Sequence, residues 1–208
     1  MQKKVTREQK KEKSKQKFLD AVGSILEDKG HAGLKVNDIA KKAGLDKKLI
    51  YKYFGSTNGL LDEYIRSKDF WSNVKISDAA SEPTIDNGKA FATELLQNQF
   101  DYVSQDKEFQ KVLLWSLSEE RKSLKKMTQD QEENGELMFG AITDPHFGEK
   151  AEDFRAVMAL LISGTYYLSL YAEANGSTFC GLDLKNATDN SKIKDALKFL
   201  INSAYKNL

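Results

Sequence analysis

The stretch DKKLIYKYFGS, from Asp46 to Ser56, sets two opposite demands on one short helix. If the stretch forms a helix, with 100° per residue, its apolar residues lie on one face and require a core: Leu45, Leu49, Ile50 and Phe54. The opposite face collects donors suited to phosphates and base edges: Lys47, Lys48, Tyr51 and Lys52. Tyr53 lies near the border. The pattern predicts a helix that packs on one side and binds a polyanion on the other.

Two further helical patterns precede this stretch. Residues 17–30, KFLDAVGSILEDKG, place apolar residues at helical spacing and end at Gly30, which is typical of a helix C-terminus. Residues 36–44, VNDIAKKAG, form a shorter pattern that ends at Gly44. Asp46 is then a good N-cap for the third helix. Short helix, glycine-containing turn and short helix together indicate a helix-turn-helix.

The rest of the chain reads as helices separated by turns, with no convincing alternating strand. We expect helices at residues 57–74, 89–104, 107–117, 119–141, 150–174 and 191–206. The turn-rich segment ISDAASEPTIDNG, residues 76–88, is the expected domain boundary. The sequence therefore predicts an all-α protein of three parts: a basic flexible tail at 1–13, a helix-turn-helix domain at 14–75 and a larger helical domain at 86–208.

The charge is distributed unevenly along the chain. Residues 1–53 hold 15 lysines and arginines against 7 acidic residues, a net charge of +8. The remainder holds 17 against 24, a net charge of −7, so the formal net charge of +1 hides a basic head on an acidic body. Such a head is typical of a domain that binds nucleic acid, although a lysine-rich solvated tail has the same composition.

Several classes of protein fit the sequence poorly. The longest apolar run, near 156–162, is far shorter than the roughly 20 residues of a spanning helix, and the charged N-terminus lacks the apolar region of a secretory signal. One cysteine and two distant histidines offer no disulfide and no zinc site. No nucleophile–base pair or phosphate-binding glycine loop stands out. We therefore expect a soluble cytoplasmic protein that is not an enzyme and needs no cofactor or metal.

The larger domain is rich in aromatic residues. Most of them fill a core, but three with polar tips are candidates for a pocket that binds an amphipathic ligand: Trp115, Tyr166 and Tyr167. Core packing remains the simpler interpretation of each one.

The last two helical patterns indicate an assembly surface. Residues 154–175 are apolar over more than one face, which a helix covered on one side does not tolerate. Residues 193–208 add Ile193, Leu197, Leu200, Ile201 and Ala204. Paired with a twofold copy, the two helices would form a four-helix interface. Alternatively, the first of them is the central helix of the monomer.

Residues 14–65 resemble the DNA-binding domain of the TetR family of transcriptional regulators. The matching residues are Gly30, Val36, Asp38-Ile39-Ala40, Ala43-Gly44, Ile50-Tyr51, Phe54, Ser56 and Leu60-Leu61. The resemblance implies a homodimeric, repressor-like protein whose larger domain binds a small-molecule effector and dimerises. It also implies that Tyr51 contacts a phosphate of the operator.

The chain departs from the family pattern at several positions. Thr57 stands where a phosphate-contacting lysine is usual, and Asn37 stands where arginine is frequent. Lys35, Lys47 and Lys48 can supply the missing charge, so the candidate DNA-binding residues are Lys35, Asn37, Lys47, Lys48, Tyr51, Lys52 and Tyr53. The departure at Thr57 keeps a second interpretation open: a helical small-molecule carrier or scaffold whose helix-turn-helix no longer binds DNA.

Overall fold

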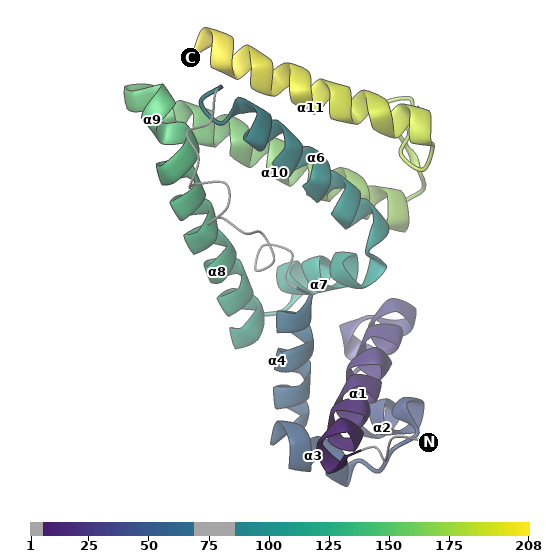
Figure 1. The fold of residues 1–208 in the computed structure, drawn as a ribbon. Helices are drawn as coiled ribbons and strands as arrows, with labels where there is room; N and C mark the ends of the chain where they lie inside the picture. The colour runs from purple at the N-terminus through teal and green to yellow at the C-terminus, as the bar shows by residue number, and fades with distance from the viewer. Residues whose placement is uncertain (1–5, 69–85) are drawn as a thin grey trace, which may run out of the picture. The chain divides into compact units, whose positions relative to one another are not determined.

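The structure, a computed structural model, describes residues 6–68 and 86–208, and these residues are almost entirely helical (Figure 1). The elements up to residue 68 are α1 (Arg7–Lys29), η1 (His31–Gly33), α2 (Val36–Ala43), α3 (Lys48–Phe54) and α4 (Thr57–Ser67). After residue 86 come α6 (Lys89–Gln105), α7 (Lys107–Ser118), α8 (Lys122–Met138), η3 (Phe139–Thr143), α9 (Asp144–Phe147), η4 (Gly148–Lys150), α10 (Ala151–Ala174), β1 (Thr178–Phe179), β2 (Leu182–Asp183) and α11 (Ala187–Asn207). The all-α prediction is confirmed.

The described chain forms two compact units. The N-terminal unit contains residues 6–68 together with 107–127, and the C-terminal unit contains 86–106 together with 128–208. The helices α7 and the start of α8 thus belong with the helix-turn-helix, although the sequence places them in the larger domain. Residues 76–85 of the expected boundary at 76–88 lie outside the described residues, as do the last residues of the expected helix at 57–74.

The core of the N-terminal unit explains why α7 joins it. Phe18, Ile39 and Ile50, from the first three helices, are all fully buried in one cluster with residues of α4. Val112 and Trp115 of α7 belong to the same cluster. Burial of large apolar side chains is worth roughly 1.5–3 kcal/mol each, so α7 supplies a substantial share of the stability of this small unit.

The first helix begins earlier than the sequence analysis expects. Thr6 caps α1 by accepting a hydrogen bond from the backbone N–H of Gln9, whose side chain in turn accepts from the N–H of Thr6. This reciprocal pair is a capping box, which satisfies two of the amides that a helix N-terminus leaves without partners. Residues 7–13, assigned to a flexible tail from the sequence, are therefore the exposed first turns of α1.

The C-terminal unit is built on α6, α10 and α11, which pack around one apolar cluster (Figure 1). Phe100, Phe154 and Ile201 are its most deeply buried members, one from each helix. A two-residue antiparallel pairing of β1 with β2 lies in the segment 175–190, where the sequence predicts only a loop. Asn186 caps α11 four residues earlier than expected, by accepting from the amides of Thr188 and Asp189. Of the described helices, none combines the length and apolar character that a membrane crossing needs.

One polar side chain in the core of the C-terminal unit lacks hydrogen bonds. Gln99 of α6 is completely buried, and its amide nitrogen and oxygen find no partner among the residues that the structure describes. A buried polar group without a hydrogen-bond partner lowers the free energy of unfolding by about 1–3 kcal/mol. The packing of α6 therefore carries a local penalty at this position.

We expect Gln99→Leu to stabilise the protein, because leucine fills a similar volume and brings no polar atom into the core. The free energy of unfolding should rise by about 1–3 kcal/mol in urea titrations followed by circular dichroism. Gln97→Leu is the matched control, because the Gln97 amide donates to the carbonyl oxygen of Lys194 at 3.0 Å. Equal destabilisation of both variants would contradict the assignment of Gln99 as a buried side chain without hydrogen-bond partners.

Candidate functional site

The helix α3 has the two faces that the sequence predicts. Ile50 is fully buried, and Leu49 and Phe54 pack against the core of the N-terminal unit. Phe54 meets Phe18 edge to face at a centroid distance of 6.1 Å. Lys47, Lys48 and Lys52 are exposed, and Tyr51 is 50% exposed. One face of α3 is thus fixed by packing while the other presents three ammonium groups and a phenol to the surroundings.

The turn before α3 fixes how that exposed face is presented. Gly44 adopts a left-handed conformation at φ 65°, which costs glycine little and most residues much. The N-cap of α3 is Lys47 and not Asp46 as the sequence predicts; Asp46, one residue earlier, accepts from the backbone N–H of Lys48 at 2.8 Å. Lys47 donates to the side-chain oxygen of Asn37 on α2 at 3.2 Å. Lys35 and Asn37 are exposed, so the candidate residues of α2 and α3 share one surface.

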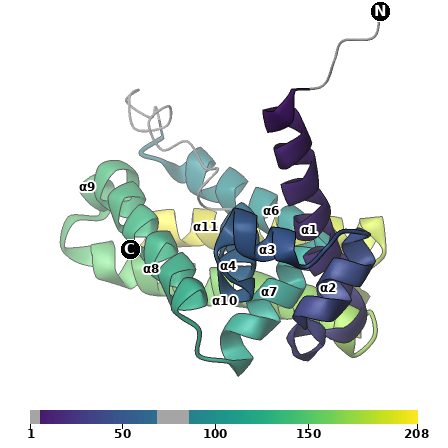
Figure 2. The same cartoon turned by 90° about the horizontal axis from the view of Figure 1, so that it is seen from below.

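A basic cleft lies between the first turns of α1 and the end of α3 (Figure 2 shows these helices from below). It has a volume of about 760 Å³ and combines four cationic side chains with one carboxylate and three hydroxyl groups. Its residues are Thr6, Arg7, Glu8, Lys10, Lys11, Ser14, Lys52 and Tyr53. Cations and hydroxyl donors together suit the oxygens of a phosphodiester backbone.

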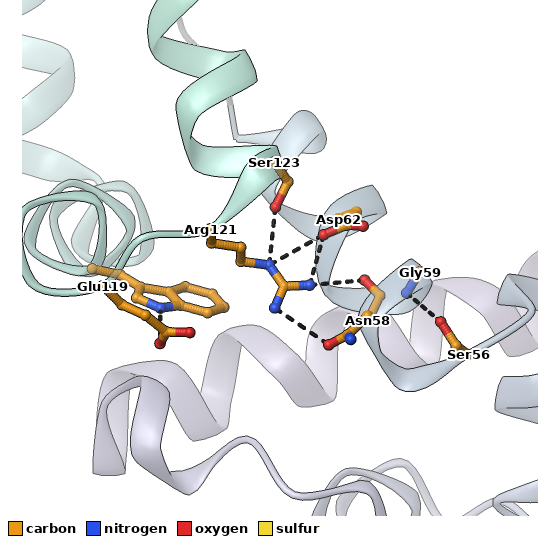
Figure 3. A network of polar contacts seen from close by, with 8 residues as sticks. Ser56, Asn58, Gly59, Asp62, Glu119, Arg121 and Ser123 are labelled. Atoms are coloured by element: carbon orange, nitrogen blue, oxygen red, sulfur yellow. Dashed lines mark hydrogen bonds and ion pairs between the residues drawn. The ribbon is translucent and has the colours of Figure 1, made fainter.

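The segment that joins α7 to α8 holds α4 through one arginine (Figure 3). The Arg121 guanidinium donates to the Asp62 carboxylate from Nη2 at 2.6 Å and from Nε at 3.1 Å. It also donates to the backbone carbonyl of Asn58 at 3.1 Å and lies over the ring of Trp115. Asn58 and Asp62 lie in the first half of α4, directly after the helix-turn-helix. This network therefore ties the start of α8 to the helix that follows α3.

A cavity of about 430 Å³ lies in the C-terminal unit between α6, α8 and α10. Its apolar wall comes from Leu95, Met138, Phe139, Met158, Ala159 and Ile162. Polar and charged side chains complete the lining: Gln131, Glu132, Glu136, Arg155, Ser163 and Tyr166. This size and this mixture of an apolar wall with a few polar groups are typical of sites for drug-sized molecules.

The charged part of the cavity is organised by one arginine. Arg155 donates to Asp144 through Nη2 at 2.5 Å and Nε at 3.2 Å, and to both carboxylate oxygens of Glu136 through Nη1. Its guanidinium also lies over the ring of Phe139, 5.2 Å from the centroid. The hydrogen bonds to Asp144 are the main cause that raises the pKa of Arg155 above its usual value. Arg155 is therefore a fixed cation with most of its donors in use.

The three aromatic residues proposed from the sequence as a ligand pocket lie in different surroundings. Only Tyr166 lines the cavity. Trp115 lies in the core of the N-terminal unit, where its ring stacks on His31 and its Nε1–H donates to Glu119 at 2.8 Å. Tyr167 is 56% exposed on α10 and contacts the ring of Phe179. The Nε1–H of Trp115 thus has its acceptor on α7's own C-terminal side, at Glu119.

Most of the exposed large apolar side chains of the C-terminal unit lie on α10 and α11, and Leu137 of α8 is a further one. Leu160 is 74% exposed, Phe199 is 66% exposed and Leu200 is 42% exposed. Of the residues of the last helix predicted to face a partner, Leu197, Ile201 and Ala204 instead lie in the core of their own unit. The α11 register turns them inward because α6 and α10 cover that side of the helix. Leu160, Phe199 and Leu200 are therefore the candidates for an assembly surface.

Two groups of residues at these candidate sites were not predicted from the sequence. The cleft residues of α1 were overlooked because 7–13 were assigned to a tail, although the capping signature Thr6-x-x-Gln9 is visible in the sequence. The Arg155 cluster joins residues 19 and 11 positions apart in the chain, and no local pattern pointed to it.

Comparison with known proteins agrees with this geometry. A sequence model described as "Bacterial regulatory proteins, tetR family" matches residues 14–64. No curated protein matches the chain significantly. A TetR-like transcriptional regulator from Rhodococcus sp. RHA1 is similar in structure, with a TM-score of 0.64, 16% identity, and coverage of 94% of this chain and 97% of that one.

Two further solved structures share the fold with similar TM-scores and sequence identities. A TetR family transcription regulator from Marinobacter aquaeolei VT8 has a TM-score of 0.63 and 15% identity, and covers 96% of this chain and 97% of its own. The transcriptional regulator FadR from Bacillus subtilis, in complex with stearoyl-CoA, has a TM-score of 0.62 and 16% identity, with coverage of 91% and 98%. The helix-turn-helix sequence at residues 14–64 thus matches the tetR family model, and the chain as a whole has the same fold as these solved structures.

Proposed function

We propose that this protein is a cytoplasmic transcriptional repressor that binds a two-fold DNA operator as a homodimer and is released by a small-molecule effector. The observation that carries the proposal is the division of α3 into a face buried in the core and a face of lysines and tyrosine. A recognition helix needs this division, because only a helix held from behind can present side chains to the major groove in fixed register.

The two basic surfaces are proposed to have different roles on DNA. Lys48 and Tyr51 lie on the exposed face of α3, where a lysine can reach base edges and a tyrosine hydroxyl can donate to a phosphate. Lys52 shares its cleft with Arg7 and Lys10 of α1. We therefore assign the cleft to the phosphate backbone beside the operator, and Lys48 to sequence recognition.

The homodimer is proposed to form through the exposed apolar residues of α10 and α11. Leucine and phenylalanine side chains that are exposed to this degree keep their apolar surface in contact with water until a second surface covers them. A twofold axis would bring the same helices of two chains together and place two recognition helices on one operator.

The cavity of the C-terminal unit is the proposed effector site. The FadR structure contains stearoyl-CoA, which supports the idea that this fold accommodates an amphipathic molecule. Glu132, Gly135 and Glu136 of α8 line the cavity, while Leu124 and Met127 of the same helix lie in the core of the N-terminal unit. Arg121, directly before α8, holds α4. A ligand that prefers one position of α8 would then change the equilibrium between DNA-binding conformations.

Selection of duplexes from a random pool tests the function and separates it from the alternative of a carrier without DNA binding. A repressor of this kind should enrich a palindromic duplex whose half-sites lie about one helical turn apart. Absence of any enriched sequence would favour the carrier.

Lysine substitutions test the two roles. We expect Lys48→Ala to weaken binding to the selected duplex by about 1–3 kcal/mol and binding to a scrambled duplex far less, because a base contact is lost. Lys10→Ala and Lys52→Ala should weaken both duplexes alike and lower the slope of log K against log salt by about 0.9 per contact. Fluorescence anisotropy over a salt series measures both quantities.

Lys29→Ala is the control, since Lys29 is exposed at the opposite end of α1 and should change neither quantity. An unchanged ratio of selected to scrambled affinity in Lys48→Ala would rule out sequence recognition by this residue.

Charge substitutions test the dimer. Leu160→Glu or Phe199→Glu should shift the mass seen by light scattering from twice the 23.5 kDa chain mass toward the monomer, because each places a carboxylate in the apolar interface. Leu137→Glu, at a 64% exposed residue of α8, is the matched control and should stay dimeric. A wild-type protein that remains monomeric at micromolar concentration would disprove the assembly.

Arg121→Ala tests the link between α8 and α4. Loss of the contacts to Asn58 and Asp62 should speed amide hydrogen exchange along Thr57–Ser67 by about fivefold, equivalent to roughly 1 kcal/mol. Exchange in α11 should stay the same. Arg66→Ala, at an exposed arginine of α4, is the control. Equal exchange in α4 of wild type and Arg121→Ala would show that this network does not hold the helix.

A further inference from the structure

The charges around the effector cavity are unequal in sign. Glu132 and Glu136 line the cavity together with a single arginine, Arg155, which also binds the carboxylate of Asp144. Three carboxylates and one guanidinium among these residues leave an excess of two negative charges. Among the described residues that line the cavity, no lysine or second arginine offsets this excess.

Arg155 is poorly placed to receive an anionic ligand. Its donors are directed to Glu136 and Asp144, and one face of its guanidinium is occupied by Phe139. A carboxylate or phosphate ligand would have to displace Glu136 from this pair and then lie near Glu132. Breaking a charge-assisted, bidentate pair to form another of the same kind brings little net gain, and the repulsion from the remaining carboxylates opposes it.

A cationic ligand meets the opposite situation. Glu132 and Glu136 both lie on α8, on the exposed side of the cavity, and the Glu136 side chain is 62% exposed. Leu95, Met158 and Ile162 offer an apolar wall from α6 and α10. A positive head near the glutamates and an apolar body against this wall would satisfy both parts of the lining.

We propose that the cavity takes an amphipathic organic cation, with its positive head beside Glu132 and Glu136 and its apolar body between α6 and α10. This inference rests on the proposed effector function and adds the chemical class of the effector. It predicts that the protein discriminates between amphiphiles by the sign of the head group and not only by the length of the chain.

The test compares two probes with one alkyl chain and opposite heads, decyltrimethylammonium and decanoate. Both are titrated into the full-length protein below their micelle concentrations, at low salt, by isothermal titration calorimetry. Decyltrimethylammonium should bind more tightly than decanoate. Glu132→Gln should weaken the cation by about threefold to tenfold, the range expected for a partly solvated charge pair, and should leave decanoate unchanged or slightly improved.

Glu136→Gln gives a sharper result, because it removes a negative charge and frees donors of Arg155 at once. It should weaken the cation and strengthen decanoate, so that the preference moves toward the anion. Glu133→Gln is the matched control: Glu133 lies next to Glu132 on α8, accepts from Gln129 at 2.9 Å and does not line the cavity. Circular dichroism verifies the fold of each variant.

Each outcome decides the inference. Tighter binding of decanoate by the wild type, no binding of either probe, or equal effects of the Glu132 and Glu133 substitutions would overturn it. A second readout keeps the proposed function separate: anisotropy of the selected duplex with and without decyltrimethylammonium. If the cation binds at the glutamates but leaves DNA affinity unchanged, the ligand class stands and the effector role fails.

Discussion

The packing of α3 on α1 is the constraint on which the rest of this structure depends. Ile50 and Phe54 reach the core only if the opposite face of the same helix stays outside, and this face contains the lysines. A helix of seven residues has no stability of its own in water, so tertiary contacts must hold it. The lysine-bearing face of α3 is therefore only as rigid as the core behind it, which α4 and α7 complete.

Local signals in the sequence were sufficient to predict this first part. Gly44 ends one helix, Asp46 accepts from the first backbone amide of the next, and the apolar residues of α3 repeat at helical spacing. Each signal acts over a few residues, so a single sequence shows it directly. The capping box at Thr6 is a signal of the same kind. It predicts a first helix that begins at Arg7, in the segment that was expected to be a tail.

Contacts between residues that lie far apart in the sequence were harder to predict. The sequence does not show whether an apolar face packs within its own unit or on a partner, so Leu197 was assigned to the assembly surface although it lies in the core. Trp115 illustrates the same difficulty, because its environment depends on α7 joining the first helices. The acceptors of Arg155 lie on α8 and at the start of α9, and only the tertiary structure shows that they meet.

The helix α8 has an unusual role in this arrangement. Its buried residues are Leu124 and Met127 near one end and Met138 at the other, and residues 128–137 include none that is buried. Arginine–carboxylate contacts act near both ends, from Arg121 just before the helix and from Arg155 to Glu136. Exposed pairs of this kind contribute little stability each, so Glu136 gains little stability for this end of α8 from its pair with Arg155. If the proposed effector site is correct, a ligand that contacts Glu132 and Glu136 would compete with a pair of small energy, and a modest difference in affinity would suffice to favour one conformation.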